Sequence, residues 1–374
     1  MSKEALLQIK RFMYNQERQR LIRVMPSWEQ SFCDFSTNDY LALSHNEAVI
    51  EAGCRAARLY GAGSTGSRLI SGNVPIFAEL EARIAQGKKA QAALYFSSGF
   101  QANASLIKAL VDRDSVLLLD KLNHASMYYG AFASRAKLLR FEHLDYSCLE
   151  EQLKENSGRK MLIASETVFG MDGDIADICV LSSLSEKYGA LLYLDEAHAT
   201  GLYGSNGYGL STTCALNPDT TIIMGTFSKA LGGSGAYVAC SQLLKDYFIQ
   251  TCGGFVYSTA PSPFCAGAAI CSWDLVHNMG SVRAGIFNLT SVLRQRTTNA
   301  GYDVLGADTN IVPIVFPSVE DMFHAKERLR RNGLIVSGIR PPTSPSPRIR
   351  IAVNAMHEQD DIETLLNVFT SEPM

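Results

Sequence analysis

Seven short apolar runs, each followed by a stretch with helical spacing, constrain the fold of this chain more than any other feature of its sequence. Several of them, such as SVLLLD and ALLYLD, lack the alternation of polar and apolar residues that a half-exposed strand shows. Strands that are apolar on both faces belong in a mainly parallel sheet covered by helices. The sequence therefore predicts an α/β domain of three layers around a mostly parallel, seven-stranded sheet. The runs lie at 92–96, 115–120, 137–141, 160–165, 190–195, 220–225 and 235–241.

The pattern changes near Trp273, where a long helical stretch leads into the strand-like segments TNIVPIVF and RIRIAVN and a final helix, DIETLLNVF. We therefore predict an N-terminal helical or extended segment at 1–37, a large α/β domain at 38–272 and a small α+β domain at 273–374. In open α/β sheets, ligands bind at the carboxyl ends of the strands. Functional side chains are expected just after the apolar runs.

Charge and composition argue against several classes of partner. The formal net charge is −3, from 34 Lys and Arg against 37 Asp and Glu, and no basic block is present, so nucleic acid is not expected as a partner. No apolar run is long enough to span a bilayer, and the charged N-terminus lacks a signal-peptide core, so we expect a cytoplasmic protein. Nine cysteines without a C-x-x-C pair, among them Cys179, Cys240 and Cys265, are expected to be reduced and buried.

The stretch GAGSTG at 61–66 matches the G-x-G-x-x-G dinucleotide fingerprint, which has meaning only between a strand and a helix. The preceding residues, NEAVIEAGCRAARLY, have the spacing of a helix, and SRLISGN after the match does not begin an obvious helix. The match therefore does not predict a nucleotide site.

Two further chemistries fit the sequence only in part. Asp195, Glu196 and His198 could ligate a metal, but no second histidine lies at helical spacing, as H-E-x-x-H requires. The segment GGSGA matches the nucleophile motif G-x-S-x-G only partially, and no strand–Ser–helix elbow surrounds it. A metal site and a nucleophilic serine are both ranked below a third interpretation.

A pyridoxal phosphate site accounts for the polar residues after the apolar runs together. Asp195 ends a buried run, where a carboxylate needs a cationic partner and could keep a pyridine nitrogen protonated. Lys229, in the small-residue loop TFSKALGGSG, could form the Schiff base. The helix that begins near Gly99 could hold the phosphate at its N-terminus. His124 could stack on the ring, and His198 could donate to its phenolate oxygen.

A set of longer motifs resembles the α-oxoamine synthases, a branch of the fold-type I pyridoxal-phosphate enzymes. The resemblance covers nearly the whole chain and implies a homodimer with shared active sites, in which an amino acid condenses with an acyl thioester and carbon dioxide is released. The glycine-rich stretch 61–66 would then lie over the substrate end of the site. The motifs are FSTNDYLALS, GSRLISG, FSSGFQAN, LNHAS, ETVFGMDGD, DEAHATGLYG, GTFSKALGGSGAY, FVYSTAPSP and RIRIAVNAMH, in this order.

The same resemblance implies roles for individual residues. Lys229 would hold the cofactor and move the substrate proton, Asp195 would pair with the pyridinium nitrogen, and His124 could also donate to the acyl oxygen. Further cofactor contacts would come from Gly99, Phe100, His124, Glu166, His198, Thr226 and, toward the neighbouring subunit, Ser258 and Thr259. Substrate contacts would come from Arg23, Asn38, His124, Thr343 and Arg350, with Arg348 as the alternative for the carboxylate.

The segment IRPPTSP most resembles the branch of the family that joins L-alanine to a pimeloyl thioester in biotin synthesis. Two rival branches use glycine with acetyl-CoA or serine with a long acyl chain, and an inert scaffold subunit is the non-enzymatic alternative. The acyl carrier could be coenzyme A or a carrier protein. The N-terminal basic residues would suit a carrier protein, although they also fit a solvated helix face: Lys10, Arg11, Arg18, Arg20 and Arg23.

One departure from the family pattern lies in VFGMDGD, where Gly170 occupies a position that is usually serine. The change removes a hydroxyl donor near the phenolate oxygen, so His198 would make that contact more alone. We expect the substitution to affect the pH at which the bound cofactor titrates.

Overall fold

The computed structural model of the chain describes residues 3–18, 22, 25 and 32–370. The chain divides into two compact units, Met1–Phe32 and Cys33–Met374. The first unit contains the helix α1 (Lys3–Arg18). The second unit contains all other described helices and strands.

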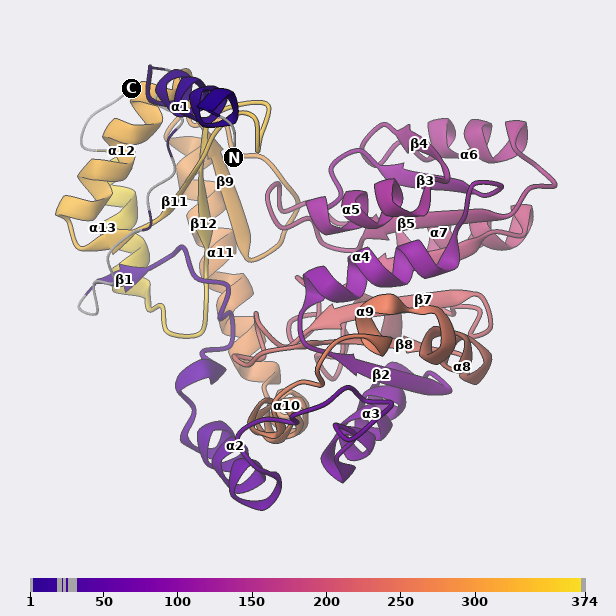
Figure 1. Cartoon of the computed structure of the whole chain (residues 1–374). Coiled ribbons are helices and arrows are strands. Elements are labelled where there is room, and N and C mark those ends of the chain that lie inside the picture. Colours follow the sequence, from indigo (N-terminus) through magenta and orange to yellow (C-terminus); the bar gives the residue numbers. More distant parts are fainter. Residues whose placement is uncertain (1–2, 19–21, 23–24, 26–31, 371–374) are drawn as a thin grey trace. The chain divides into compact units, whose positions relative to one another are not determined.

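The second unit is built around the seven-stranded sheet that the apolar runs predict (Figure 1). Its strand order is β2-β8-β7-β6-β5-β3-β4. Each pair of neighbours is parallel except the two pairs that β8 makes, because β8 runs antiparallel to β7 and β2. The strands are β2 (Ala92–Phe96), β3 (Val116–Asp120), β4 (Lys137–Phe141), β5 (Met161–Glu166), β6 (Leu191–Asp195), β7 (Thr221–Thr226) and β8 (Ala236–Cys240).

Helices cover both faces of this sheet, which explains why most of its strands are apolar throughout. One face packs against α4 (Gly99–Leu110), α5 (Ala125–Ser134), α8 (Gln242–Thr251) and α9 (Gly253–Val256). The opposite face packs against α3 (Pro75–Lys88), α6 (Tyr146–Glu155), α7 (Ile178–Tyr188) and α10 (Pro263–Val276), and α2 (Glu47–Tyr60) lies against α10. The three-layer prediction is confirmed.

The C-terminal part of this unit contains a three-stranded antiparallel sheet of order β11-β12-β9, flanked by three helices. Its apolar core is continuous with the core under the large sheet, since one cluster includes Trp273, Ile314 and Ile351. The predicted boundary at 272/273 falls inside α10 and stays a prediction. The elements are α11 (Gly280–Asn299), β9 (Ile311–Val315), α12 (Val319–Arg331), β10 (Leu334–Ile335), β11 (Ser337–Ile339), β12 (Arg348–Ala352) and α13 (Gln359–Thr370), with β1 (Cys33–Asp34) parallel to β10.

The glycine-rich stretch 61–66 follows a helix, as the sequence predicts, because α2 ends at Tyr60 and Gly61 caps it with a φ of 94°. The next helix, α3, begins only at Pro75. The backbones of Gly66 and Gly72 lie so close that a Cβ on Gly72 would lie 2.7 Å from the carbonyl carbon of Gly66. The stretch is therefore a tightly packed loop, without the strand–turn–helix geometry of a dinucleotide site.

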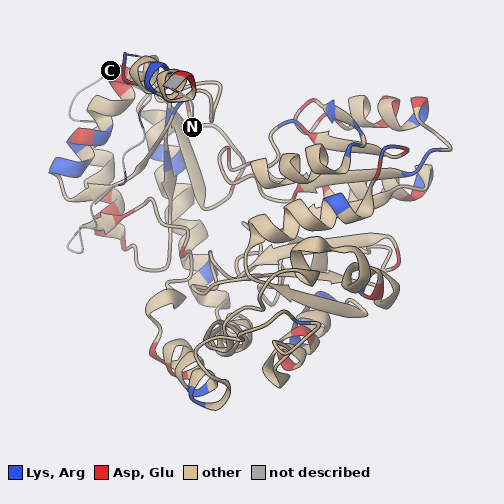
Figure 2. Ribbon diagram, viewed as in Figure 1, with Lys and Arg blue, Asp and Glu red and all other residues tan. Residues whose placement is uncertain are grey.

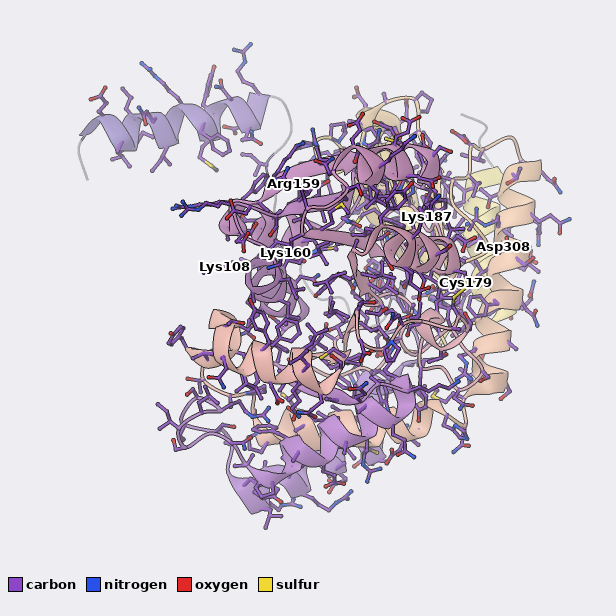
Figure 3. The ribbon with its side chains drawn as sticks, turned by 90° about the vertical axis from the view of Figure 1, so that its right-hand side faces the viewer. Lys108, Arg159, Lys160, Cys179, Lys187 and Asp308 are labelled. Atoms are coloured by element: carbon purple, nitrogen blue, oxygen red, sulfur yellow. A yellow bond between two sulfur atoms is a disulfide. The ribbon has the colours of Figure 1, made fainter. Side chains whose placement is uncertain are left out.

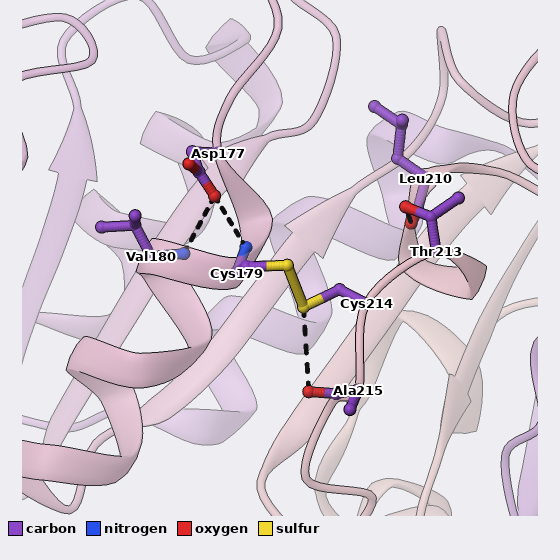
Figure 4. Close-up of a disulfide and its surroundings, with 7 residues drawn as sticks. All are labelled: Asp177, Cys179, Val180, Leu210, Thr213, Cys214 and Ala215. Atoms are coloured by element: carbon purple, nitrogen blue, oxygen red, sulfur yellow. Dashed lines mark hydrogen bonds between the residues drawn. A yellow bond between two sulfur atoms is a disulfide. The ribbon is translucent and has the colours of Figure 1, made fainter.

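The prediction of nine reduced, buried cysteines is wrong for two of them, because Cys179 and Cys214 form a disulfide (Figure 4). Cys179 lies in the first turn of α7, where the N-cap Asp177 accepts hydrogen bonds from the N–H groups of Cys179 and Val180. Cys214 follows the short 3-10 helix η2 (Leu210–Thr212). Cys179 is exposed on the surface of the unit (Figure 3).

The two cysteines are 35 positions apart, which matches no spacing that is typical of a disulfide framework. The sequence therefore did not predict the bond. The prediction of burial is also wrong for five of the seven free cysteines, because only Cys240 and Cys252 are buried. The five half-buried cysteines are Cys33, Cys54, Cys148, Cys265 and Cys271.

Acidic and basic side chains are interspersed over the described helices and loops (Figure 2). The described helices include none that is both long and apolar enough to cross a membrane.

Candidate active site

The carboxyl ends of β5 and β6 place two carboxylates side by side. Glu166 and Asp195 are the last residues of these strands and are paired in register, and both are buried. Burial, together with the neighbouring charge of Asp195, raises the pKa of Glu166 to about 8. Glu166 is therefore mostly neutral at pH 7.

Asp195 is held in place by neutral donors. The amide Nδ2 of Asn103, on α4, donates to one carboxylate oxygen at 2.7 Å, and the N–H of Ala197 donates to the other at 2.9 Å. Asn103 is itself fixed, since it accepts from the hydroxyl of Tyr193 and donates to Ser126. Among the described residues, the hydrogen bonds to this carboxylate come from uncharged groups, so the carboxylate can still form an ion pair with a cationic ligand placed against it.

The loop after β7 brings a lysine to the same end of the sheet. Lys229 Nζ lies 2.6 Å from His198 Nε2. Burial lowers the pKa of Lys229 to about 8, although Asp195 and Glu166 act in the opposite direction. Burial, together with the charges of Lys229 and Arg350, lowers the pKa of His198 well below its usual value, so the imidazole is neutral.

His198 has a second partner, since its Nδ1 lies 2.7 Å from the hydroxyl of Tyr40. Tyr40 is fully buried, and its hydroxyl also lies 3.1 Å from the side-chain oxygen of Asn38. Arg350 donates from Nη2 to both of these oxygens at 3.1 Å. An unbroken hydrogen-bonded chain therefore runs from Lys229 to Arg350.

Two arginines on β12 reach the segment that follows β5, but only one joins this chain. Arg350 donates from Nε to the carbonyl oxygen of Gly170 at 2.5 Å. Arg348, two residues earlier on the same strand face, is buried in an ion pair with Asp172 and donates to Ser346. Its guanidinium is therefore paired with a carboxylate, whereas Arg350, which is also buried, donates among the described residues only to the uncharged oxygens of Gly170, Asn38 and Tyr40.

Residues 30–369 match the family model of class I and II aminotransferases. The 8-amino-7-oxononanoate synthase of Gluconacetobacter diazotrophicus is 39% identical over 348 residues, which cover 90% of this chain and 87% of the relative. The enzyme of the same name from Geobacter sulfurreducens is 40% identical over 332 residues, with coverages of 87% and 85%. The chain belongs to the 8-amino-7-oxononanoate synthase family.

Solved structures place this family on a scaffold that it shares with another activity. Serine palmitoyltransferase of Sphingomonas wittichii has a TM-score of 0.87 at 27% identity, covering 91% of this chain and 86% of its own. The 8-amino-7-oxononanoate synthase of Francisella tularensis has a TM-score of 0.79 at 26% identity, with coverages of 92% and 98%. A structure of SPT with its pyridoxal phosphate has a TM-score of 0.90 at 25% identity, covering 96% of each chain. The fold alone therefore does not distinguish the two activities. The sequence does favour one of them, because the chain is 39–40% identical to the two 8-amino-7-oxononanoate synthases above and 25–27% identical to the two serine palmitoyltransferase structures.

The family resemblance predicts a serine at the position of Gly170, and the structure shows what the lack of a side chain there permits. A Cβ at this position would lie 2.6 Å from Cδ2 and Cε1 of His198. Such a distance is about 1 Å inside the usual separation of carbon atoms. The space that Gly170 leaves is therefore filled by the imidazole, in the orientation that contacts Lys229 and Tyr40.

At the start of α4, Gly99 faces the buried Thr226, since a Cβ at Gly99 would lie 3.8 Å from the Cβ of Thr226. The hydroxyl of Thr226 donates to the carbonyl oxygen of Gly235 at 2.8 Å and lies equally close to the hydroxyl of Ser228. Phe100 is half-exposed and packs edge-on against Tyr129 at 5.1 Å. Because the residues here are small, the N–H groups in the first turn of α4 could bind an anionic ligand such as a phosphate group.

His124 caps α5 and is linked to Asp195 through two side chains. Its Nδ1 accepts from the N–H of Ser126 and lies 2.7 Å from the Ser126 hydroxyl, which in turn accepts from Asn103. Because Nδ1 is an acceptor, the ring proton is on Nε2. His124 therefore belongs to the same end of the sheet as the residues above.

The remaining predicted site residues lie elsewhere. Ser258 and Thr259 line a small crevice with Ser97 and Gln101, and Thr259 pairs with Ser67. Thr343 is exposed in the loop before β12, where its N–H donates to the carbonyl of Arg340. Arg23 and Arg20 lie outside the described residues, and Lys10, Arg11 and Arg18 are on α1.

Metal ligation, considered above for Asp195, Glu196 and His198, finds no support in the geometry. Glu196 points to the opposite layer, where it is paired with the buried Lys88 and accepts from Ser211. The part of the chain that the structure describes contains no group of three or more His, Cys, Asp or Glu that could hold a metal ion.

Sequence reasoning missed Tyr40 as a member of the site. Its motif, FSTNDYLALS, was singled out, but only Asn38 received a role. The signal that could have found Tyr40 is a tyrosine that follows a polar stretch and precedes apolar residues of the core, because a buried phenol needs a hydrogen-bond partner.

Proposed function

We propose that the chain condenses L-alanine with a pimeloyl thioester and releases carbon dioxide, giving 8-amino-7-oxononanoate, with pyridoxal phosphate as its cofactor. The names of the relatives support the reaction. The observation that carries the proposal is that the buried Asp195, whose hydrogen bonds come from uncharged groups, lies at the same end of the sheet as a lysine whose pKa burial lowers to about 8.

The residues present fit pyridoxal phosphate. The cofactor carries a pyridinium that would lie against Asp195, where the only donors shown among the described residues are neutral. Glu166 stays protonated at neutral pH, so a single negative charge would face the ring nitrogen. Lys229 is the group that would bind the cofactor, and the first turn of α4 at Gly99 would receive its phosphate beside Thr226. When bound, the cofactor withdraws electrons from the α-carbon of the amino acid.

The amino-acid end of the reaction uses the chain from Lys229 to Arg350. Arg350 offers a planar pair of donors to the substrate carboxylate, with Asn38 beside it. Lys229 takes the α-proton, which a free amine can do near neutral pH because burial lowers its pKa. His198 holds Lys229 through Nε2 and would reach the phenolate oxygen of the cofactor.

The acyl end involves His124, Thr343 and the neighbouring subunit. His124 Nε2–H would donate to the oxygen of the thioester carbonyl as charge develops there. Thr343 would contact the acyl chain, and Ser258 and Thr259 would reach the phosphate of a second copy. Large apolar side chains exposed on the described surface support a homodimer, among them Ile70, Phe100, Tyr129, Phe132 and Tyr257.

Two assignments stay predictions. The first is that Arg23 and the other N-terminal basic residues contact the acyl carrier, whether this is coenzyme A or a carrier protein. The second is the cytoplasmic location.

The experiment titrates the purified protein with pyridoxal phosphate and follows its visible absorbance, then adds L-alanine, glycine or L-serine, each with pimeloyl-CoA. We expect a saturable absorbance change that Lys229→Ala abolishes. Of the three amino acids, we expect only L-alanine, added with pimeloyl-CoA, to give 8-amino-7-oxononanoate by mass spectrometry. Product from glycine or serine instead would move the chain to a rival branch of the family. An unaltered cofactor spectrum would contradict the proposal and favour the inert scaffold.

A further inference from the structure

The hydroxyl of Tyr40 has one proton and two acceptors within reach. It lies 2.7 Å from His198 Nδ1 and 3.1 Å from Asn38 Oδ1, while Arg350 Nη2 donates to its oxygen. A hydroxyl can donate to only one of these acceptors at a time. The chain can therefore be oriented in two ways, and the orientation decides which nitrogen of His198 carries the ring proton.

In the first orientation, the Tyr40 hydroxyl donates to Asn38. His198, which is neutral, then carries its proton on Nδ1 and donates to the Tyr40 oxygen, so Nε2 is an acceptor. An ammonium group has three donors and no acceptor, so a charged Lys229 fits only this orientation.

In the second orientation, the hydroxyl donates to Nδ1 of His198. The ring proton must then lie on Nε2, from where it donates to Lys229 Nζ. Because that nitrogen needs a lone pair to accept, this orientation requires Lys229 to be neutral. Arg350 can donate to Tyr40 and Asn38 in both orientations, since its Nη2 has two hydrogens.

We propose that Tyr40 is a positioning residue that couples the binding of the substrate carboxylate at Arg350 and Asn38 to the protonation of Lys229. This inference rests on the proposed function, because it takes Arg350 and Asn38 as the carboxylate site. An arriving carboxylate is a stronger acceptor than an imidazole nitrogen or an amide oxygen and attracts the Tyr40 hydroxyl. His198 Nε2 then becomes an acceptor, so Lys229 can hold the proton that it removes from the substrate.

Other charged groups face Lys229, and the test must separate their effect from that of Tyr40. Asp195 on β6 and Glu166 on β5 raise the pKa of Lys229, whereas Arg350 on β12 lowers it, and His124 lies before α5. A carboxylate beside Arg350 would raise this pKa through charge alone. Tyr40 contributes to this rise in the pKa of Lys229 only if the rise becomes smaller when the Tyr40 hydroxyl is removed.

The experiment measures the pKa of Lys229 in protein freed of cofactor, with and without propionate, which is a carboxylate without an amine. Trace reductive methylation by formaldehyde and cyanoborohydride, followed over pH by peptide mass spectrometry, reports the neutral fraction of Lys229. We expect propionate to raise the pKa in the wild type by about one unit more than in Tyr40→Phe, which is the scale of one hydrogen bond.

Tyr203→Phe is the matched control. Tyr203 has a buried hydroxyl for which the described residues provide no hydrogen-bond partner, so its removal should leave the propionate shift at the wild-type value. An equal shift in the wild type and Tyr40→Phe, or no shift in the wild type, would overturn the coupling.

If Tyr40→Phe does not fold, His198→Leu provides the second variant. It keeps the Tyr40 hydroxyl but removes the ring that links it to Lys229, so propionate should raise the pKa of Lys229 by about one unit less than in the wild type, through charge alone, and a shift equal to that of the wild type would overturn the coupling. These readouts need neither cofactor nor turnover. Failure of the proposed function would instead appear as a missing condensation product in a protein whose Lys229 still responds to propionate.

Discussion

Replacement of Gly170 by alanine should displace the imidazole of His198. The added Cβ would lie 2.6 Å from two ring carbons, so the ring must turn and its hydrogen bonds to Lys229 and Tyr40 must break. Two hydrogen bonds contribute about 1 kcal/mol each, and overpacking of a buried site costs about 1–3 kcal/mol. We expect the free energy of unfolding to fall by about 3–5 kcal/mol and the melting temperature by roughly 4–6 °C.

Thermal unfolding of the cofactor-free protein measures this loss, with Gly285→Ala as the control. Gly285 lies in α11, and no heavy atom lies within 4 Å of a Cβ built there. Alanine is favoured over glycine in a helix by about 1 kcal/mol, so this variant should be slightly more stable than the wild type. If Gly170→Ala melts within about one degree of the wild type, the imidazole does not occupy the space beside Gly170 and the reasoning fails.

Gly170→Ser introduces the same Cβ together with the hydroxyl that the family resemblance predicts at this position. Its pH titration, followed by the visible absorbance of the bound cofactor, should differ from that of the wild type, because the Cβ displaces the ring of His198 and the hydroxyl adds a donor beside it. An unchanged titration would contradict this expectation.

Three further outcomes follow from the structure. The pKa of Glu166 rises from 4.5 unfolded to about 8 folded, so its contribution to stability is complete below pH 4.5 and is lost as the pH rises through 8; Glu166→Gln should flatten this decline in urea unfolding, and parallel slopes for the two proteins would argue against it. Arg350→Lys should raise the KM for alanine about 10–100-fold and lower the free energy of unfolding by about 1–3 kcal/mol, because its hydrogen bonds to Gly170, Asn38 and Tyr40 are weakened. Arg348→Met should lower the free energy of unfolding by about 3–5 kcal/mol without a comparable rise in KM, and steady-state kinetics with urea unfolding would show whether only Arg350→Lys affects KM. Cys214→Ser opens the link to Cys179 and should lower the free energy of unfolding by about 3–4 kcal/mol; equal stability of the wild type with and without a reducing dithiol would contradict a stabilising bond.

The strands of the large sheet could be predicted because burial on both faces leaves a direct trace in the sequence. Each predicted run agrees with a strand to within one or two residues. The residues of β8 themselves do not show that it runs antiparallel to β7. The length of the connection at 227–235 does show it, because a parallel crossover needs a dozen or more residues and this loop is shorter.

The candidate site was predictable where each residue follows its own strand, as Asp195 and Lys229 do. Tyr40 and Arg350 come to this place from distant parts of the chain, and 310 residues separate them. Pattern alone cannot show that two such residues meet. The choice between Arg348 and Arg350 depended in the same way on the position of Asp172, which pairs with Arg348.

The strand order of the large sheet has a consequence for synthesis on the ribosome. β2 is an edge strand, apolar at all five positions, and it pairs in the described sheet only with β8. The 139 residues between Phe96 and Ala236 must be made before this partner exists, which takes on the order of 10–30 s at typical rates of translation. During that interval the nascent chain carries an unpaired AALYF segment, which is a site for chaperone binding or for association with a second nascent chain.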